Sequence, residues 1–273
     1  ILLSLFCSVS FGADEVWWQP YDASQSGTVM LAHFDETTPE GNGWAPISGQ
    51  HPGGSYNGFL GQVGEEGDLT AAGKFNTGYS PDGLNDHADF FNKDTGGATN
   101  LLDDMTAESW VKFDVGGLQR AAWHESTIIS HSWGQSYRFR VLETPENQGL
   151  LRFSSLTDSG EITLDGWGTY LDEGSWHHVA ATRDIEGTDV TMKLYIDGAE
   201  IASEVYSGIS SFVGDSGDWS ATNIGNFRDL NNGFMGTIDE VRLSDVARTY
   251  SVPEPISIAL LGLGGLFLRR RSK

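Results

Sequence analysis

Two pairs of adjacent ionisable residues, Asp239-Glu240 and His177-His178, are the first candidates for catalytic chemistry. Successive side chains of a β-strand point to opposite faces, so neither pair can act together across one bond. The sequence has no Gly-x-Ser-x-Gly nucleophile motif and no His-Glu-x-x-His zinc motif. A binding module is therefore favoured over a hydrolase or lyase without recognisable spacing, and over a purely structural envelope component.

Four tryptophans in or near Gly-rich, Ser-rich or turn-like segments are candidates for sugar binding. Sugar rings stack on flat, rigid aromatic surfaces, while neighbouring Asp, Asn and Gln side chains bond the sugar hydroxyl groups. The alternative is a place in the core, which is expected for Trp110 and Trp176 on predicted strands. The predicted ligand-binding residues are Trp123, Trp133, Trp167 and Trp219.

The elements that must position these residues are β-strands. Residues 190–196 read Val-Thr-Met-Lys-Leu-Tyr-Ile, and this alternation is the period of a strand with one buried face. Asp197-Gly198 follows at once and suits a type I′ hairpin turn, in which both central residues need φ > 0. Turn signals recur about every 8–12 residues, and no segment has a long helical period, so the pattern predicts an all-β sandwich.

Several stretches closely resemble the laminin-G-like branch of the concanavalin A-like jelly rolls. They lie at residues 83–87, 106–111, 176–180, 194–198 and 236–243. The resemblance spans roughly residues 29–250 and implies a two-sheet antiparallel jelly roll. It implies less about function, because this fold hosts lectins, adhesive modules and glycan-cleaving enzymes. Glycosidases of the fold carry closely spaced acids on one strand, such as Glu-x-Asp-x-Glu, and the sequence has no such motif.

A structural calcium ion is the predicted cofactor. On the predicted strand 238–243, Asp239 has the parity of apolar residues, and Asp35 has the parity of Val29 and Leu31 on the first strand. A buried carboxylate needs compensation, which arginine, backbone amides or calcium can supply. Relatives on this fold often hold such an ion between the first and last strands, so Asp35 and Asp239 are the predicted metal ligands.

The composition gives a strongly acidic chain with a formal net charge of −22. Without the C-terminal tail, the body has 12 basic and 37 acidic residues. Such a body repels phosphate backbones, which argues against nucleic-acid binding and favours cations or neutral sugars, unless the charge only maintains solubility. The only cysteine is Cys7, so the predicted mature domain has no disulfide.

Both ends of the chain carry targeting signals. Residues 1–13 have the apolar core and small residues of a secretory signal peptide, and residues 14–250 form the predicted jelly-roll domain. Residues 251–273 resemble the PEP-CTERM sorting signal of Gram-negative bacteria: Pro253-Glu254-Pro255, an apolar run at 256–268 predicted as a short helix, and Arg269-Arg270-Arg271.

The sorting signal implies export to the cell envelope, cell surface or extracellular matrix. It also implies processing by an exosortase-type enzyme after transient membrane contact through residues 256–268. The run is shorter than the roughly 20 residues of a full helical span, although a short permanent anchor remains the alternative. The predicted binding partner is a polysaccharide or glycoprotein.

Overall fold

The computed structural model describes residues 19–35, 45–51, 54–61, 68–84, 86–118, 124–132, 136–226 and 232–251. The predicted signal peptide and nearly all of the predicted sorting segment, including its apolar helix, lie outside these residues. Within them the regular secondary structure is almost entirely antiparallel strands, and α1 (Asn92–Thr95) is a single turn. The described part contains no helix of the length and apolarity needed to cross a membrane.

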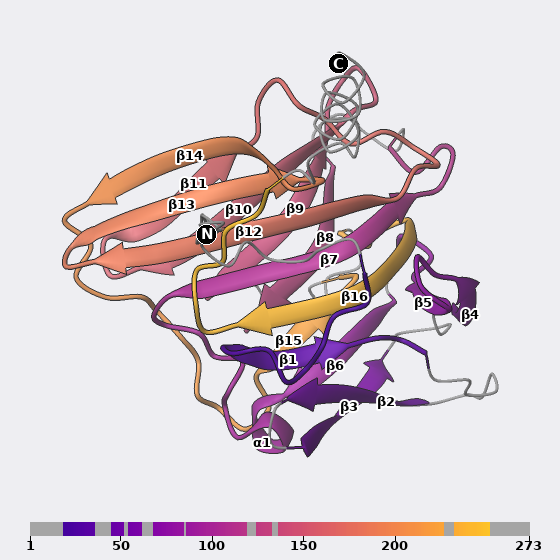
Figure 1. The fold of residues 1–273 in the computed structure, drawn as a ribbon, viewed down its shortest axis with the longest axis horizontal. Coiled ribbons are helices and arrows are strands. Elements are labelled where there is room, and N and C mark those ends of the chain that lie inside the picture. Colours follow the sequence, from indigo (N-terminus) through magenta and orange to yellow (C-terminus); the bar gives the residue numbers. More distant parts are fainter. Residues whose placement is uncertain are drawn as a thin grey trace, which may run out of the picture.

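The strands form the predicted two-layer sandwich (Figure 1). The first layer has the order β1 (Thr28–Ala32), β16 (Gly236–Ser244), β7 (Met105–Phe113), β12 (His177–Glu186), β13 (Asp189–Ile196) and β14 (Ala199–Ser207). The second layer has the order β6 (His87–Phe91), β15 (Ala221–Ile224), β8 (Glu125–His131), β9 (Tyr137–Glu143), β10 (Gly149–Thr157) and β11 (Gly160–Asp165).

Two further pairs of strands complete the sandwich. Strands β2 (Ala45–His51) and β3 (Gly54–Gly61) continue the hydrogen-bonded path from β1 to β6. Strands β4 (Asp68–Ala72) and β5 (Thr77–Ser80) form a hairpin that adjoins β16, where Tyr79 pairs with Ile238.

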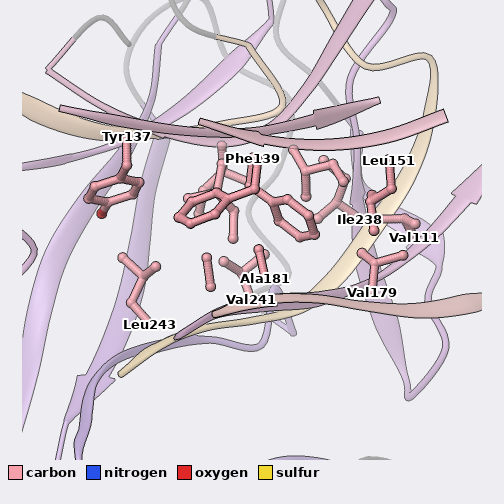
Figure 2. Packing of buried hydrophobic residues seen from close by; sticks show 14 of the residues in the cluster. Val111, Tyr137, Phe139, Leu151, Val179, Ala181, Ile238, Val241 and Leu243 are labelled. Atoms are coloured by element: carbon pink, nitrogen blue, oxygen red, sulfur yellow. The ribbon is translucent and has the colours of Figure 1, made fainter. Parts of the chain in front are cut away.

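The core lies between the two layers. Tyr137, Phe139 and Leu151 project from β9 and β10 toward apolar residues of β7, β12 and β16 (Figure 2). Burial of such large side chains contributes about 1.5–3 kcal/mol each. Arg183 of β12 also points inward, and its guanidinium donates to the backbone oxygens of Leu101 and Asp103.

The predicted central meander is present as β12, β13 and β14. Every second residue of β13 from Val190 to Ile196 is buried in the core cluster. Asp197 has φ 50° and Gly198 has φ 78°, so both turn residues take the left-handed conformation that the sequence predicts. Trp110 is buried as expected, whereas Trp176 precedes β12 and is only partly buried.

Candidate ligand-binding face

The outward face of the second layer is polar. In β9, Tyr137, Phe139 and Val141 point into the core, so Arg138 and Arg140 point outward. The strand register places polar residues of β6, β15, β8 and β10 beside them on the same face. We call this set the polar face: Asp89, Thr127, Ser130, Arg138, Arg140, Arg152, Ser154 and Asn223.

Most side chains of the polar face are buried although they point away from the core. Asp89, Thr127, Ser130 and Asn223 are fully buried. Outward residues of a flat, open sheet would instead be exposed to solvent. Other parts of the protein therefore cover these side chains.

Hydrogen bonds and ion pairs fix part of the polar face. The Asn223 side-chain amide donates to the Asp89 carboxylate. Arg152 makes two bonds to Asp165, of 2.5 and 2.7 Å. Arg140 Nη1 donates to Ser154 Oγ at 3.0 Å. The arginines, the serine and the amide are thereby held in defined orientations.

Other atoms of the polar face make no hydrogen bond. Among the described residues, no hydrogen-bond partner exists for the buried Thr127 Oγ1, Ser130 Oγ, Asn223 Oδ1 or Arg140 Nε, although Arg140 Nε lies 3.3 Å from Glu125 Oε1. A buried polar atom without a partner costs about 1–3 kcal/mol. Buried polar atoms of this kind are usually paired with a protein group, a ligand or water. The polar face thus offers hydroxyl and guanidinium donors together with an amide acceptor.

An exposed aromatic ring stands at one end of the polar face. Trp219 is 71% exposed and precedes β15, whose first residue, Ala221, pairs with Phe91 of β6. The Trp219 ring meets Phe91 edge to face with ring centroids 5.9 Å apart, and Lys93 Nζ lies 5.2 Å from the indole centroid. Most of this ring is therefore exposed to solvent.

The other predicted tryptophans do not join Trp219. Trp167 is 56% exposed, but it follows β11 at the opposite end of the layer, near the end of β10 that carries Arg152. Strands β10, β9 and β8 lie between β11 and β15 in this layer, so the two rings do not form one small site. Trp123 and Trp133 lie outside the described residues.

The two predicted metal ligands are in different environments. Asp35 is exposed, contrary to its expected burial, because Phe34 has φ 58° and interrupts the alternation of β1. Its carboxylate accepts from the Asn76 side chain at 3.1 Å and the Thr77 amide at 3.3 Å. Asp239 is fully buried, as expected.

The surroundings of Asp239 fit the backbone-amide alternative. Asp239 Oδ2 accepts from the Phe75 amide at 2.9 Å, and Oδ1 accepts from the Glu240 amide at 2.8 Å. Burial raises the pKa of Asp239 to about 7. Among the described residues, no three His, Cys, Asp or Glu side chains are arranged to hold a metal ion. Calcium binding at Asp35 and Asp239 stays a prediction.

A second buried polar cluster lies on the outward face of the first layer. Glu108 of β7 is fully buried there and accepts from Arg242 Nε at 2.7 Å, while His178 Nε2 lies 3.2 Å from its other oxygen. Residues near the two ends of the described chain pack over this buried ion pair. Tyr21 lies under the Arg242 guanidinium at 4.1 Å, and Tyr250 packs on His178 with ring centroids 5.2 Å apart. We call these five residues the terminal cluster.

The resemblance to laminin-G-like domains implies a structural role for His177 and His178, and their contacts agree with that interpretation. His178 belongs to the terminal cluster. His177 lies between two carboxylates, with Asp172 at 2.5 Å and Asp197 at 2.8 Å. The two rings diverge as expected for neighbours on a strand, and neither reaches the polar face.

The polar face itself was not identified from the sequence. A signal existed in Tyr-Arg-Phe-Arg-Val at 137–141, where arginines alternate with core residues. A strand pattern shows which residues share a face but not which strands are neighbours. The pairing of Ser130 with both Asn223 and Arg138 could not be read without the sheet order.

Comparison with known families agrees with this architecture. Residues 82–251 match the model of the laminin-G-like group described as the concanavalin A-like lectin/glucanases superfamily. The chain belongs to this superfamily. Residues 251–272 match the PEP-CTERM protein-sorting motif, which indicates export to the envelope or surface of a Gram-negative bacterium. No curated protein matches the sequence.

Solved structures with the same fold are distant in sequence. The binding domain of Paraclostridial mosquitocidal protein 1 has a TM-score of 0.54 at 13% identity, covering 83% of this chain and 50% of that one. The binding domain of botulinum neurotoxin serotype D has a TM-score of 0.54 at 14% identity, covering 88% and 51%. The present chain spans about half the length of each of these two binding domains. At this identity the likeness establishes the fold alone.

Proposed function

We propose that the protein is an exported, non-catalytic module that binds glycans through the polar face. The observation that carries this proposal is the group of buried polar atoms without a hydrogen bond on Thr127, Ser130, Arg140 and Asn223, next to the exposed ring of Trp219. Sugar hydroxyl groups donate and accept hydrogen bonds, so they match a surface that presents both functions. Neighbouring structures described as toxin binding domains are in keeping with a binding role.

Trp219 extends this site in the proposal. A sugar unit stacked on its exposed ring would place the next unit over Asn223, whose strand begins two residues after Trp219. The strands then lead the ligand across Ser130 toward Arg138. A polysaccharide lying across the strands in this way would contact several polar side chains at once. Trp167 at the other end would be reached only by a longer chain.

The test is a glycan array probed with the purified exported protein, followed by titration of the best ligand. We expect Trp219→Ala and Asn223→Ala each to weaken binding at least tenfold, because each removes a direct ligand contact. Val205→Ala is the control, since this residue is exposed on β14 of the other layer. Wild-type affinity of both site variants would overturn the proposed site.

Catalysis is tested in the same experiment. The exported protein should bind its glycan and leave it intact, because the sequence shows no spaced pair of catalytic carboxylates. Incubation with the bound glycan should release neither reducing ends nor unsaturated products. Their appearance in amounts that track the purified protein would establish the hydrolase or lyase alternative instead.

The finer localisation is also proposed. An exosortase-type enzyme would remove the tail near Pro255 and release the domain to the cell surface or extracellular matrix. The PEP-CTERM match at residues 251–272 supports this step. Contact of residues 256–268 with the membrane would then be transient.

A further inference from the structure

Two of the four tryptophans among the described residues are exposed, and both lie in turns next to strands of the second layer. Trp110 and Trp176 pack in the aromatic cluster of the first layer. Trp219 belongs to the proposed site, whereas Trp167, which is 56% exposed, has no role there. A tryptophan normally buries a large apolar area, so the fold leaves the flat Trp167 ring largely unused.

The turn that carries Trp167 has an ordered base. The Gly166 amide donates to the Leu151 oxygen at 2.9 Å and so extends the pairing of β10 with β11. A Cβ atom on Gly166 would lie 2.6 Å from Cδ1 of Ile201 in β14, so the backbone packs closely against that strand. Gly168 has φ 89°, which closes the turn. An aromatic ring held in this way needs little further ordering to bind a ligand.

Polar groups lie near the exposed ring. The Arg152–Asp165 pair ends two residues before the ring, and its side chains are 25% and 19% exposed. Gly149 and Leu171 exchange both backbone hydrogen bonds, at 3.1 and 2.9 Å, so the exposed turn 145–148 with its two amide side chains lies beside this segment. A flat apolar ring among exposed donors and acceptors has the chemistry of a sugar-binding surface.

The two exposed rings are too far apart to share a short glycan. Four strand spacings of about 4.8 Å separate β11 from β15. Thr222 and Ile162 lie in one row of paired residues across the layer, and β15 and β11 run in the same direction. Trp219 precedes this row and Trp167 follows it, which adds to the distance. The separation is therefore roughly 20 Å or more.

We infer that the surface around Trp167 is a second glycan-binding site, so that one protein molecule holds two glycan segments at once. This inference rests on the proposed function and adds a second site to it. Two separate chains held in this way are bridged by the protein, and two segments of one long chain are held more tightly than either alone. The ligand class is neutral, hydroxyl-rich sugars, because the body of the protein is strongly acidic.

Calorimetric titration of the full exported protein with short sugars counts the sites. The probes are maltotriose, cellotriose and the trimer of N-acetylglucosamine, each too short to reach from one ring to the other. We expect at least one probe to bind at two molecules per protein. Trp167→Ala and Trp219→Ala should each reduce this number to one. A single site that Trp219→Ala abolishes, or two sites that both survive Trp167→Ala, overturns the inference.

Polymers test whether the two sites act together. Soluble amylose, hydroxyethyl cellulose and glycol chitin match the three short probes. Trp167→Ala should weaken binding of the preferred polymer at least tenfold, because one of two linked contacts is lost. Trp167→Tyr keeps a flat ring and should retain most of the affinity.

The control for the polymer measurement is Val205→Ala, which truncates an exposed side chain of the other layer. Because Trp167 is exposed, Trp167→Ala should keep the wild-type melting temperature, so a loss of binding reports the site rather than the fold. Wild-type polymer affinity of Trp167→Ala overturns the inference. This measurement decides alone if no trimer binds detectably.

The same data separate the inference from the function on which it rests. If all binding requires Trp219 and none requires Trp167, only the inference fails. If neither a trimer nor a polymer binds and the glycan array is empty, the proposed function fails with it.

Discussion

Replacing Glu108 by Gln should destabilise the protein strongly. The carboxylate is fully buried in the terminal cluster and balances Arg242, which is also fully buried. The neutral amide of the Glu108→Gln variant would keep the side-chain volume but leave the guanidinium without a counter-charge. Removing one partner of a buried ion pair typically costs about 3–5 kcal/mol, because the other charge stays buried and unpaired.

This cost can be converted into a thermal shift. One kcal/mol lowers the melting temperature of a domain of 150–250 residues by about 2–4 °C. A loss of 3–5 kcal/mol therefore corresponds to a decrease of roughly 6–20 °C. Chemical denaturation should give the same loss as a lower midpoint with an unchanged slope.

Two further variants make the test specific. Glu200→Gln removes an exposed carboxylate that pairs with Lys193 at 2.8 Å, and it should cost less than about 1 kcal/mol. Adding Arg242→Met to Glu108→Gln removes the stranded charge and should recover much of the lost stability. If Glu108→Gln is no more harmful than Glu200→Gln, the reasoning about the buried charge is refuted.

The pH dependence follows from the same contacts. Burial raises the pKa of Glu108, but the Arg242 charge and the His178 hydrogen bond outweigh it and hold the pKa well below its usual range. A carboxylate with a lowered folded pKa contributes stability above its unfolded pKa of about 4.3 and loses it as the pH falls toward the folded value. The difference between wild type and Glu108→Gln should therefore be complete at pH 7 and smaller at about pH 3.

Three other predictions concern pH, metal and processing. Burial alone would lower the pKa of His177, but the bonds to Asp197 and Asp172 outweigh burial and raise the pKa. The contribution of His177 to stability is therefore full below about pH 6.5 and is lost as the pH rises through the folded pKa. His177→Gln should flatten that part of a series of melting temperatures against pH, and an unchanged slope would contradict the assignment. Calcium bound at Asp35 and Asp239 should raise the melting temperature relative to excess chelator after exhaustive dialysis, and identical curves would exclude the site. Mass spectrometry of the exported protein should find no residues after about Pro255, whereas an intact Arg269–Arg271 tail in the envelope fraction would favour a permanent anchor.

The sequence predicted the strands best where alternation and turn chemistry agreed. In β13 the apolar residues face the core, and Asp197-Gly198 closes the hairpin. Alternation predicted the wrong burial for Asp35, which follows a residue whose backbone is not extended. Phe34 is left-handed, so Asp35 leaves the parity of the strand and is exposed.

The bulge in β16 illustrates a second limit of sequence reasoning. Asp239 was expected to be buried and is, but the register shifts between Asp239 and Arg242, and Glu240 has φ 50°. The bulge lets the Glu240 amide reach the Asp239 carboxylate. The sequence predicted that a buried Asp239 carboxylate needs compensating partners, with backbone amides among the alternatives. Only the backbone path shows which amides bond this carboxylate.

The layer order also determines how the two ends of the protein relate to its candidate site. Tyr250 packs on His178 and Tyr195, which lie on the outward face of the first layer. The polar face is the outward face of the second layer, and the core separates the two. The sorting motif at residues 251–272 therefore starts on the side opposite the polar face. The terminal cluster, which includes a residue from each terminal segment, holds Tyr21 and Tyr250 on the outward face of the first layer.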